Sequence, residues 1–248
     1  MSGKIIARVV IAILGGIALG GAIKLATAPR STLPPLPPPP TIAAERNDLP
    51  TGIVAFEERI QAGPGYTLAG SGFFLQLPDG DVIGVTTAHS LGGRNFAPMA
   101  FTTPGRDERV ATFARLHAPP GQPRTGADMT IDYVLLRPDT PPPPAFVLHP
   151  DPRGSPQPGE RVSLYSGLGD GQGGQRILPG TVESVDHNGA WVRMDSLFDP
   201  GLMSGSPLLS QHTGWVVGMT IAMNLKPGVL MIGINQVGAI LNRAMADR

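Results

Sequence analysis

The segment DPGLMSGSPLLS, residues 199–210, holds one serine, Ser204, between a bulky apolar pair and a Gly-Ser-Pro step. Its prolines and glycines exclude a helix interior, and its leucines are too apolar for an ordinary solvated loop. The pattern favours a tight turn that leads into a buried strand, with Ser204 at the bend. A nucleophilic hydroxyl fits such a bend, and so does an ordinary structural turn.

A serine hydroxyl is a weak nucleophile near neutral pH and needs a base that takes its proton. Histidine suits this task because it titrates at about pH 6.5. Of the five histidines, His89 closes an apolar strand in GVTTAHSL. We expect His149, His187 and His212 to be solvated, because they lie beside prolines or turn residues. His117 ends a strand before Ala-Pro-Pro and stays a second candidate.

A base histidine works best with a buried carboxylate that fixes its tautomer and stabilises the imidazolium. Asp132 stands immediately before the apolar run YVLL, at the mouth of an expected buried strand. Asp128 is the competing residue and lies in a more loop-like context. Each of these acids, taken alone, also has an ordinary structural explanation. A serine, a histidine and an aspartate together form the set used in nucleophilic acyl transfer.

The elements that must position these side chains read mostly as strands. From Thr51 onward, short apolar segments alternate with turn residues, and Pro78-Asp79-Gly80 marks a hairpin. Further expected strands are RVATFARLHA, IDYVLLRP, ERVSLYSGL, GAWVRMDSL, GWVVGMTIAM and GVLMIGIN. The proline-rich residues 137–160 divide them into two groups, and residues 235–248 have the apolar spacing of a helix. This order predicts an all-β barrel or sandwich with one C-terminal α-helix.

The N-terminus carries an uninterrupted apolar run from Val9 to Ile23, between Arg8 and Lys24. Residues 1–28 are long enough to span a bilayer as a transmembrane helix. A cleaved signal helix has the same positive start and apolar centre. Both alternatives export the rest of the chain to an extracellular or periplasmic location. The protein is a single-pass membrane protein in the first case and a secreted protein in the second.

Residues 29–49 include the run PPLPPPP. Such a run favours the extended polyproline II conformation and acts as a semi-rigid spacer. The expected organisation is therefore a membrane anchor or signal segment over residues 1–28, a proline-rich linker over 29–49 and a folded domain over 50–248.

Composition excludes several classes of function. The chain of 248 residues is 41% hydrophobic, which is enough for a sizeable core. Its 19 basic and 19 acidic residues give no electrostatic reason to expect a nucleic-acid partner. The absence of cysteine excludes disulfides, thiolate catalysis and cysteine-ligated zinc. No His/Asp/Glu cluster has a recognisable metal-ligand spacing, so we expect neither a metal nor a cofactor.

The segments TTAHS, DYVLL and MSGSPLL, in this order, resemble the three active-site blocks of the trypsin-like (chymotrypsin-fold) serine proteases. GSGFFLQLPDGDVIGVTTAHSL is similar to the bacterial members in particular. The resemblance covers residues 50–248 and implies two antiparallel β-barrels followed by the C-terminal helix. It also implies that His89 is the general base, Asp132 its orienting acid and Ser204 the nucleophile.

The resemblance implies a serine endopeptidase that cleaves peptide bonds in a protein or peptide substrate through an acyl-enzyme. The amides of Leu202 and Ser204 would form its oxyanion hole. The family usually has glycine at the position of Leu202, and a side chain there restricts the backbone flip that aims the donor. Loss of one donor costs about a hundred- to a thousandfold in rate. The alternative function is a catalytically inactive protease-fold module that binds peptides at the membrane surface.

Four residues are expected near the substrate. Phe198 and Asp199 precede the nucleophile and are expected to help form the primary specificity pocket. An inward Asp199 favours a basic substrate side chain, whereas an inward Phe198 favours a small or apolar one. GWVVGMTIAM resembles the strand that lines the substrate cleft in the family, which implies that Ile221 and Ala222 contact the substrate.

Overall fold

The computed structural model describes residues 33–93, 96–172 and 174–246. The chain divides into two units, Met1–Pro35 and Leu36–Arg248. The anchor or signal segment expected over residues 1–28 lies outside the described residues. Within the described ranges, no helix is long and apolar enough to cross a membrane.

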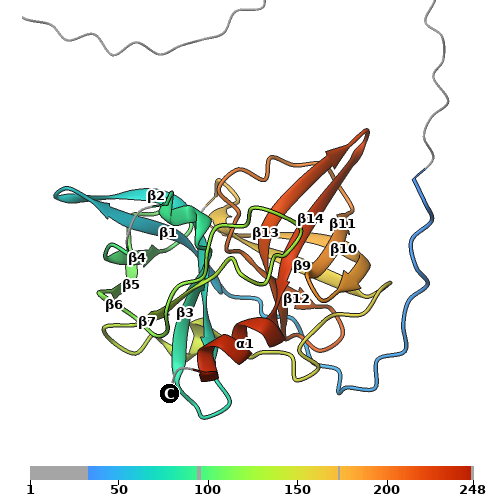
Figure 1. Ribbon diagram of the computed structural model, residues 1–248, viewed down its shortest axis with the longest axis horizontal. Coiled ribbons are helices and arrows are strands. Elements are labelled where there is room, and N and C mark those ends of the chain that lie inside the picture. Colours follow the sequence, from blue (N-terminus) through green and yellow to red (C-terminus); the bar gives the residue numbers. More distant parts are fainter. Residues whose placement is uncertain (1–32, 94–95, 173, 247–248) are drawn as a thin grey trace, which may run out of the picture. The chain divides into compact units, whose positions relative to one another are not determined.

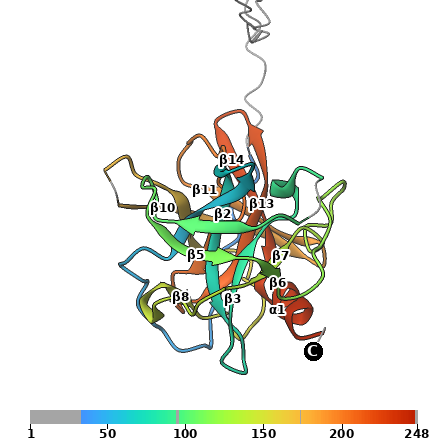
Figure 2. The ribbon, with the colours of Figure 1, turned by 90° about the vertical axis from the view of Figure 1, so that its left-hand side faces the viewer.

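The N-terminal half of the second unit is an eight-stranded sheet in the order β5-β4-β1-β2-β3-β7-β6, with β8 pairing in parallel with β2. Its strands are β1 (Ala55–Ala62), β2 (Gly65–Gln76), β3 (Val82–Thr86), β4 (Met99–Thr102), β5 (Arg109–Phe113), β6 (Arg115–Leu116), β7 (Val134–Arg137) and β8 (Val147–Leu148). Only Ala114 separates β5 from β6, the two ends of the sheet, so the sheet curls round on itself. This curled sheet stands where we expected the first barrel (Figures 1 and 2).

The C-terminal half is a closed barrel of six strands in the order β10-β11-β14-β13-β12-β9. The strands are β9 (Arg161–Gly169), β10 (Gln175–Asp186), β11 (Gly189–Met194), β12 (Pro207–Ser210), β13 (Val216–Lys226) and β14 (Val229–Gln236). Closure leaves no open strand edge. The hairpin of β13 and β14 extends beyond the rest of the barrel (Figure 1). The all-β fold with two barrel-like halves fits the expected chymotrypsin fold.

Local sequence explains the connections that hold the candidate site. The predicted hairpin at Pro78-Asp79-Gly80 joins β2 to β3, and Gly80 takes the positive φ of 92° that its turn requires. Two short 3-10 helices, η1 (His89–Leu91) and η2 (Pro144–Phe146), lie in loops. The predicted C-terminal helix is α1 (Val237–Ala246).

Apolar packing joins the two halves. The N-terminal half has an aromatic cluster of Phe56, Phe74, Phe101 and Phe113, whose neighbouring ring centroids lie 4.6 to 6.2 Å apart. Helix α1 buries Val237, Ile240 and Ala244 in a core that also contains residues from both halves. The end of α1 lies beside β6, where the ring of His117 bonds the carbonyl of Ala244 (Figure 2).

Residues 36–49, which we expected to form part of a spacer, belong to the folded unit. The amide of Asn47 donates to the carbonyl of His212 at 3.0 Å, and the His212 ring donates from Nε2 to the carbonyl of Ala44 at 2.9 Å. Tyr165 donates its hydroxyl to the carbonyl of Pro50 at 2.9 Å. The two bonds with His212 fix residues 36–49 to the C-terminal barrel, and the Tyr165 bond fixes the residue that follows them. They satisfy backbone groups that a free spacer would leave to water.

Candidate active site

His89 and Asp132 are brought together by the pairing of β3 with β7. Thr86 pairs with Val134, so the loops that follow β3 and precede β7 leave the sheet side by side. His89 Nδ1 lies 2.8 Å from Asp132 Oδ2, and the His89 amide donates to Asp132 Oδ1 at 3.0 Å. Because an ionised carboxylate only accepts, Nδ1 carries the imidazole proton and Nε2 is left as an acceptor.

The Asp132 carboxylate is 1% exposed and accepts a third hydrogen bond from the amide of Arg124 at 3.1 Å. Burial raises the pKa of Asp132, but the hydrogen bonds from His89 and Arg124 and the charge of His89 lower it further than burial raises it. Its pKa therefore lies below the ordinary value. Asp132 stays ionised at neutral pH and can orient the histidine and stabilise its charged form.

The competing candidates have other partners. Asp128 accepts from the amide of Thr130 at 2.8 Å and from its hydroxyl at 2.7 Å, which caps a local turn. His117 bonds the carbonyl of Ala244 at the end of α1. His149 and His187 are exposed, as expected. The same expectation is wrong for His212, because residues 36–49 cover it and accept its ring proton.

Ser204 lies at the bend between two consecutive turns, as expected from its glycines and prolines. The amide of Met203 donates to the carbonyl of Pro200 at 3.1 Å, and the amide of Ser206 donates to that of Met203 at 3.0 Å. The chain then enters the buried strand β12. Gly205 must be glycine, because a Cβ there would lie 1.9 Å from the carbonyl oxygen of Ser71. The nucleophile candidate is therefore held between fixed backbone segments.

Strand β2 holds the Ser204 loop beside the segment that carries His89. The amide of Ser71 donates to the carbonyl of Ser204 at 2.8 Å. A Cβ on the preceding residue, Gly70, would lie 3.0 Å from Ser90 Oγ and 3.1 Å from the same Ser204 oxygen. Ser90 directly follows His89. In the described part of the chain, no hydrogen bond joins Ser204 to the His89 ring; such bonds commonly tighten when substrate binds.

Leu202 has a left-handed backbone conformation. We expected its side chain to oppose this conformation, because the family usually has glycine at this position. Its φ is 60°, and among the described residues it is the only residue other than glycine with a positive φ. The residue is 46% exposed. Such a conformation costs about 1–3 kcal/mol and needs support from its surroundings. Part of that support is the hydroxyl of Ser71, which donates to the carbonyl of Leu202 at 2.9 Å.

The amides of Leu202 and Ser204 have no hydrogen-bond acceptor in the described part of the chain. Among the described residues, neither amide donates to a carbonyl or a side chain, whereas Met203, Gly205 and Ser206 all do. Backbone amides without an acceptor are the kind of donor that could hold an oxyanion.

Among the residues expected near the substrate, Phe198 and Asp199 point to other partners. Phe198 packs against the barrel core, and the guanidinium of Arg176 lies 5.5 Å from its ring centroid. Asp199 is exposed and accepts from the amide of Gly201 at 2.9 Å, which caps the turn before Leu202. Ile221 is 5% exposed and packs in the shared core, whereas Ala222 is half-buried at its edge.

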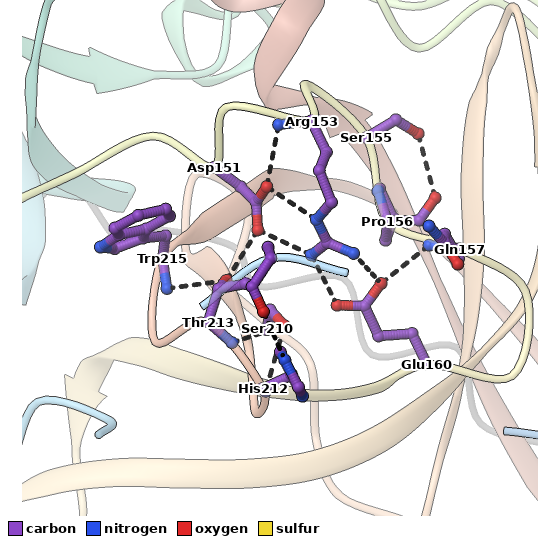
Figure 3. Close-up of polar contacts among 11 residues, drawn as sticks. Asp151, Arg153, Ser155, Pro156, Gln157, Glu160, Ser210, His212, Thr213 and Trp215 are labelled. Carbon is purple, nitrogen blue, oxygen red and sulfur yellow. Dashed lines mark hydrogen bonds and ion pairs between the residues drawn. The ribbon is translucent and has the colours of Figure 1, made fainter. Parts of the chain in front are cut away.

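A buried ion network supports the strand after Ser204 from its far end (Figure 3). Arg153 binds Asp151 at 2.7 and 2.8 Å and Glu160 at 2.9 and 3.1 Å. Thr213, in the turn after β12, donates to Asp151 at 2.7 Å. Burial raises the pKa of Asp151, but the bonds from Arg153 and Thr213 lower it below its ordinary value. The network ties residues 151–160 to the β12–β13 turn.

The sequence of residues 70–219 matches the model of the trypsin-like peptidase domain. The chain belongs to the trypsin-like peptidase family. The matched range contains His89, Asp132 and Ser204. Among the curated proteins, no match is found. In the described part of this trypsin-like peptidase domain, no group of three or more His, Asp and Glu residues could hold a metal ion.

Solved structures share the fold at low identity. A thermostable serine protease, AL20, from an extremophilic microorganism is 15% identical, with a TM-score of 0.53 over 78% of this chain and 96% of that one. The catalytically active tobacco etch virus protease, complexed with product, is 17% identical, with a TM-score of 0.51 over 84% of this chain and 85% of that one. At these identities the likeness shows a common fold.

Proposed function

We propose that this trypsin-like peptidase is an active serine endopeptidase that cleaves protein or peptide substrates. His89 is the general base, Asp132 its orienting acid and Ser204 the nucleophile. The observation that carries the proposal is the 2.8 Å bond between His89 Nδ1 and Asp132, because it leaves Nε2 unprotonated. The two unused amides of the Ser204 loop add further support.

Catalysis proceeds by acyl transfer. Ser204 Oγ bonds to the substrate carbonyl carbon and gives its proton to His89 Nε2, while the π electrons move to the carbonyl oxygen. The amides of Leu202 and Ser204 hold this oxyanion, and Asp132 stabilises the imidazolium. The C–N bond then breaks, and the leaving amine takes the proton from His89. Water repeats the sequence at the acyl carbon, which releases the acid and frees Ser204.

A second candidate function is that of an inactive module that binds peptides. Two observations favour it: Leu202 stands in a strained backbone where the family usually has glycine, and the described structure has no hydrogen bond between Ser204 and His89. Both functions would bind a peptide, so peptide binding does not separate them. Covalent reactivity of Ser204 does.

We also propose export of the peptidase domain to an extracellular or periplasmic location, either tethered by a single-pass helix or secreted after cleavage. This proposal rests on the sequence alone, on the apolar run from Val9 to Ile23.

The test is labelling of the full chain with a fluorophosphonate probe at about pH 7. Ser204→Ala and His89→Ala should each lower labelling by about a thousandfold or more. Ser196→Ala and His187→Ala are the matched controls, because both residues are exposed and outside the site, and they should label like the parent. A folded parent that does not label at all would favour the inactive module.

A further inference from the structure

A second carboxyl group lies next to the proposed active site, and the mechanism above does not use it. Glu58 in β1 is fully buried, opposite Gly70 of β2. A Cβ on Gly70 would come within 2.8 Å of Glu58 Oε2, so the glycine makes room for the carboxyl group. In the described part of the chain, Glu58 Oε1 has no hydrogen-bond partner. Burial of an ionised carboxylate with so few partners is costly.

The hydrogen bonds of Thr86 indicate which form of Glu58 is present. Thr86 Oγ1 lies 2.7 Å from Glu58 Oε2 and 2.8 Å from the carbonyl oxygen of Ser71. A hydroxyl has one proton, and both a carbonyl oxygen and a carboxylate only accept. Both contacts are full hydrogen bonds if Glu58 is protonated, because Glu58 then donates to Thr86 and Thr86 donates to Ser71.

This hydrogen-bond chain continues into the Ser204 loop. Ser71 donates its amide to the carbonyl of Ser204 at 2.8 Å and its hydroxyl to the carbonyl of Leu202 at 2.9 Å. These two carbonyls belong to the peptide groups on either side of the one that carries the Ser204 amide. A fixed Ser71 therefore fixes the orientation of an oxyanion donor and of the nucleophile beside it.

The surroundings of Glu58 favour the protonated form near neutrality. Burial raises the pKa of Glu58 to about 7, against smaller lowering effects from Thr86, Ser90 and the charge of His89. His89, on η1, is the titratable group that acts on it. The described residues that face it from the other packed elements carry no charge: Gly70 on β2, Thr86 on β3 and Phe101 on β4.

We propose that Glu58 is a positioning residue that acts in its protonated form, and that its ionisation loosens the Ser204 loop through Thr86 and Ser71. The proposal rests on the proposed function. When Glu58 releases its proton to solvent, its carboxylate becomes a hydrogen-bond acceptor. The Thr86 hydroxyl then turns to donate to Glu58, and the Ser71 carbonyl loses the hydrogen bond that it accepted from Thr86. Reactivity then falls on the alkaline side with one ionisation.

The first test is the fluorophosphonate labelling rate of the full chain from about pH 5 to pH 9. The parent should lose about tenfold in rate on the alkaline side. Glu58→Gln keeps a neutral donor for Thr86, so it should label within about threefold of the parent near pH 6 and show no alkaline fall. Glu57→Gln is the matched control on the same strand and should keep the alkaline fall. An unchanged alkaline fall in Glu58→Gln overturns the proposal.

The second test does not depend on activity. In the parent, the amide NMR shifts of Ser71, Leu202 and Ser204 should titrate together, and in Glu58→Gln they should not. If the parent never labels but these shifts titrate with Glu58, the proposed function fails and the positioning role stands. If Glu58→Gln fails to fold, the pH titration of the parent alone tests the proposal. Amide shifts of the parent that stay constant from about pH 5 to pH 9 overturn it.

Discussion

Asp132 binds His89 twice, once through the imidazole Nδ1 at 2.8 Å and once through the backbone amide at 3.0 Å. The two bonds use different carboxylate oxygens, so one side chain fixes both the position of the histidine backbone and the tautomer of its ring. Burial of this carboxylate strengthens the arrangement, because water does not compete for either oxygen.

Asp132→Asn should lower the fluorophosphonate labelling rate by about a thousand- to ten-thousandfold. The amide side chain no longer acts as an ionised acceptor, so the ring loses both its tautomer control and the stabilisation of its charge. Asp128→Asn is the matched control, because Asp128 caps a separate turn, and it should label within about threefold of the parent. A rate within tenfold of the parent in Asp132→Asn would contradict the proposed role of Asp132.

Leu202→Gly should raise the free energy of unfolding by about 1 kcal/mol, because glycine takes a φ of 60° without strain. The gain is partly offset by the greater freedom of glycine in the unfolded chain. Urea denaturation of parent and variant measures the difference. A loss of stability would mean that the exposed leucine side chain contributes more by packing than its backbone costs.

Arg153→Met should destabilise the fold by about 3–5 kcal/mol, because it leaves two buried carboxylates without their partner. The matched control is Arg161→Met, which breaks a half-exposed ion pair with Asp195 and should cost about 1 kcal/mol or less. Equal effects in the two variants would show that the buried network contributes no more than the surface pair.

Acid should weaken the same network. The pKa of Asp151 in the folded protein lies below its ordinary value of 3.8. Its stabilising contribution is therefore fully present above that value and is lost as pH falls further, through the folded pKa. Urea midpoints of the parent should drop more steeply below about pH 4 than those of Arg153→Met, in which the contribution is already missing. Parallel profiles would contradict this assignment.

Glu58 should make the folded protein less stable as pH rises, which is the opposite of the effect of Asp151. Its pKa rises from 4.5 to about 7 in the folded protein, so the unfolded chain releases this proton at lower pH than the folded one. Between these two values, stability falls as pH rises, by about 3 kcal/mol in total. Glu58→Gln removes this slope. Urea denaturation across the interval measures both profiles, and equal slopes would show that Glu58 ionises normally.

The positions of residues that lie next to a strong local sequence pattern could be predicted from the sequence. The strand before His89, the acid before YVLL and the bend at Ser204 each have a short apolar segment that marks them. We expected His89 to close the strand, but β3 ends at Thr86 and His89 begins η1. Strand β10 was missed because Pro179 and Gly180 interrupt it, although a proline is compatible with a strand where its missing amide is not required.

Features set by distant parts of the chain were not predictable. The chain from Glu58 through Thr86 and Ser71 to Leu202 joins four segments, and each member reads locally as an ordinary strand or turn residue. The left-handed backbone of Leu202 opposes the preference of its side chain, and the Ser71 hydroxyl that supports it lies on another strand. Composition led us to interpret residues 36–49 as part of a spacer. Their bonds to the barrel involve His212, which is distant in sequence, so composition did not indicate them.

The most direct measurement is identification, by peptide mass spectrometry, of the residue that a fluorophosphonate modifies in the full chain. We expect the probe on Ser204 alone and no modification of the same peptide in His89→Ala. Modification of another serine, or equal modification of Ser204 without His89, would contradict the account of Ser204 as a nucleophile activated by His89.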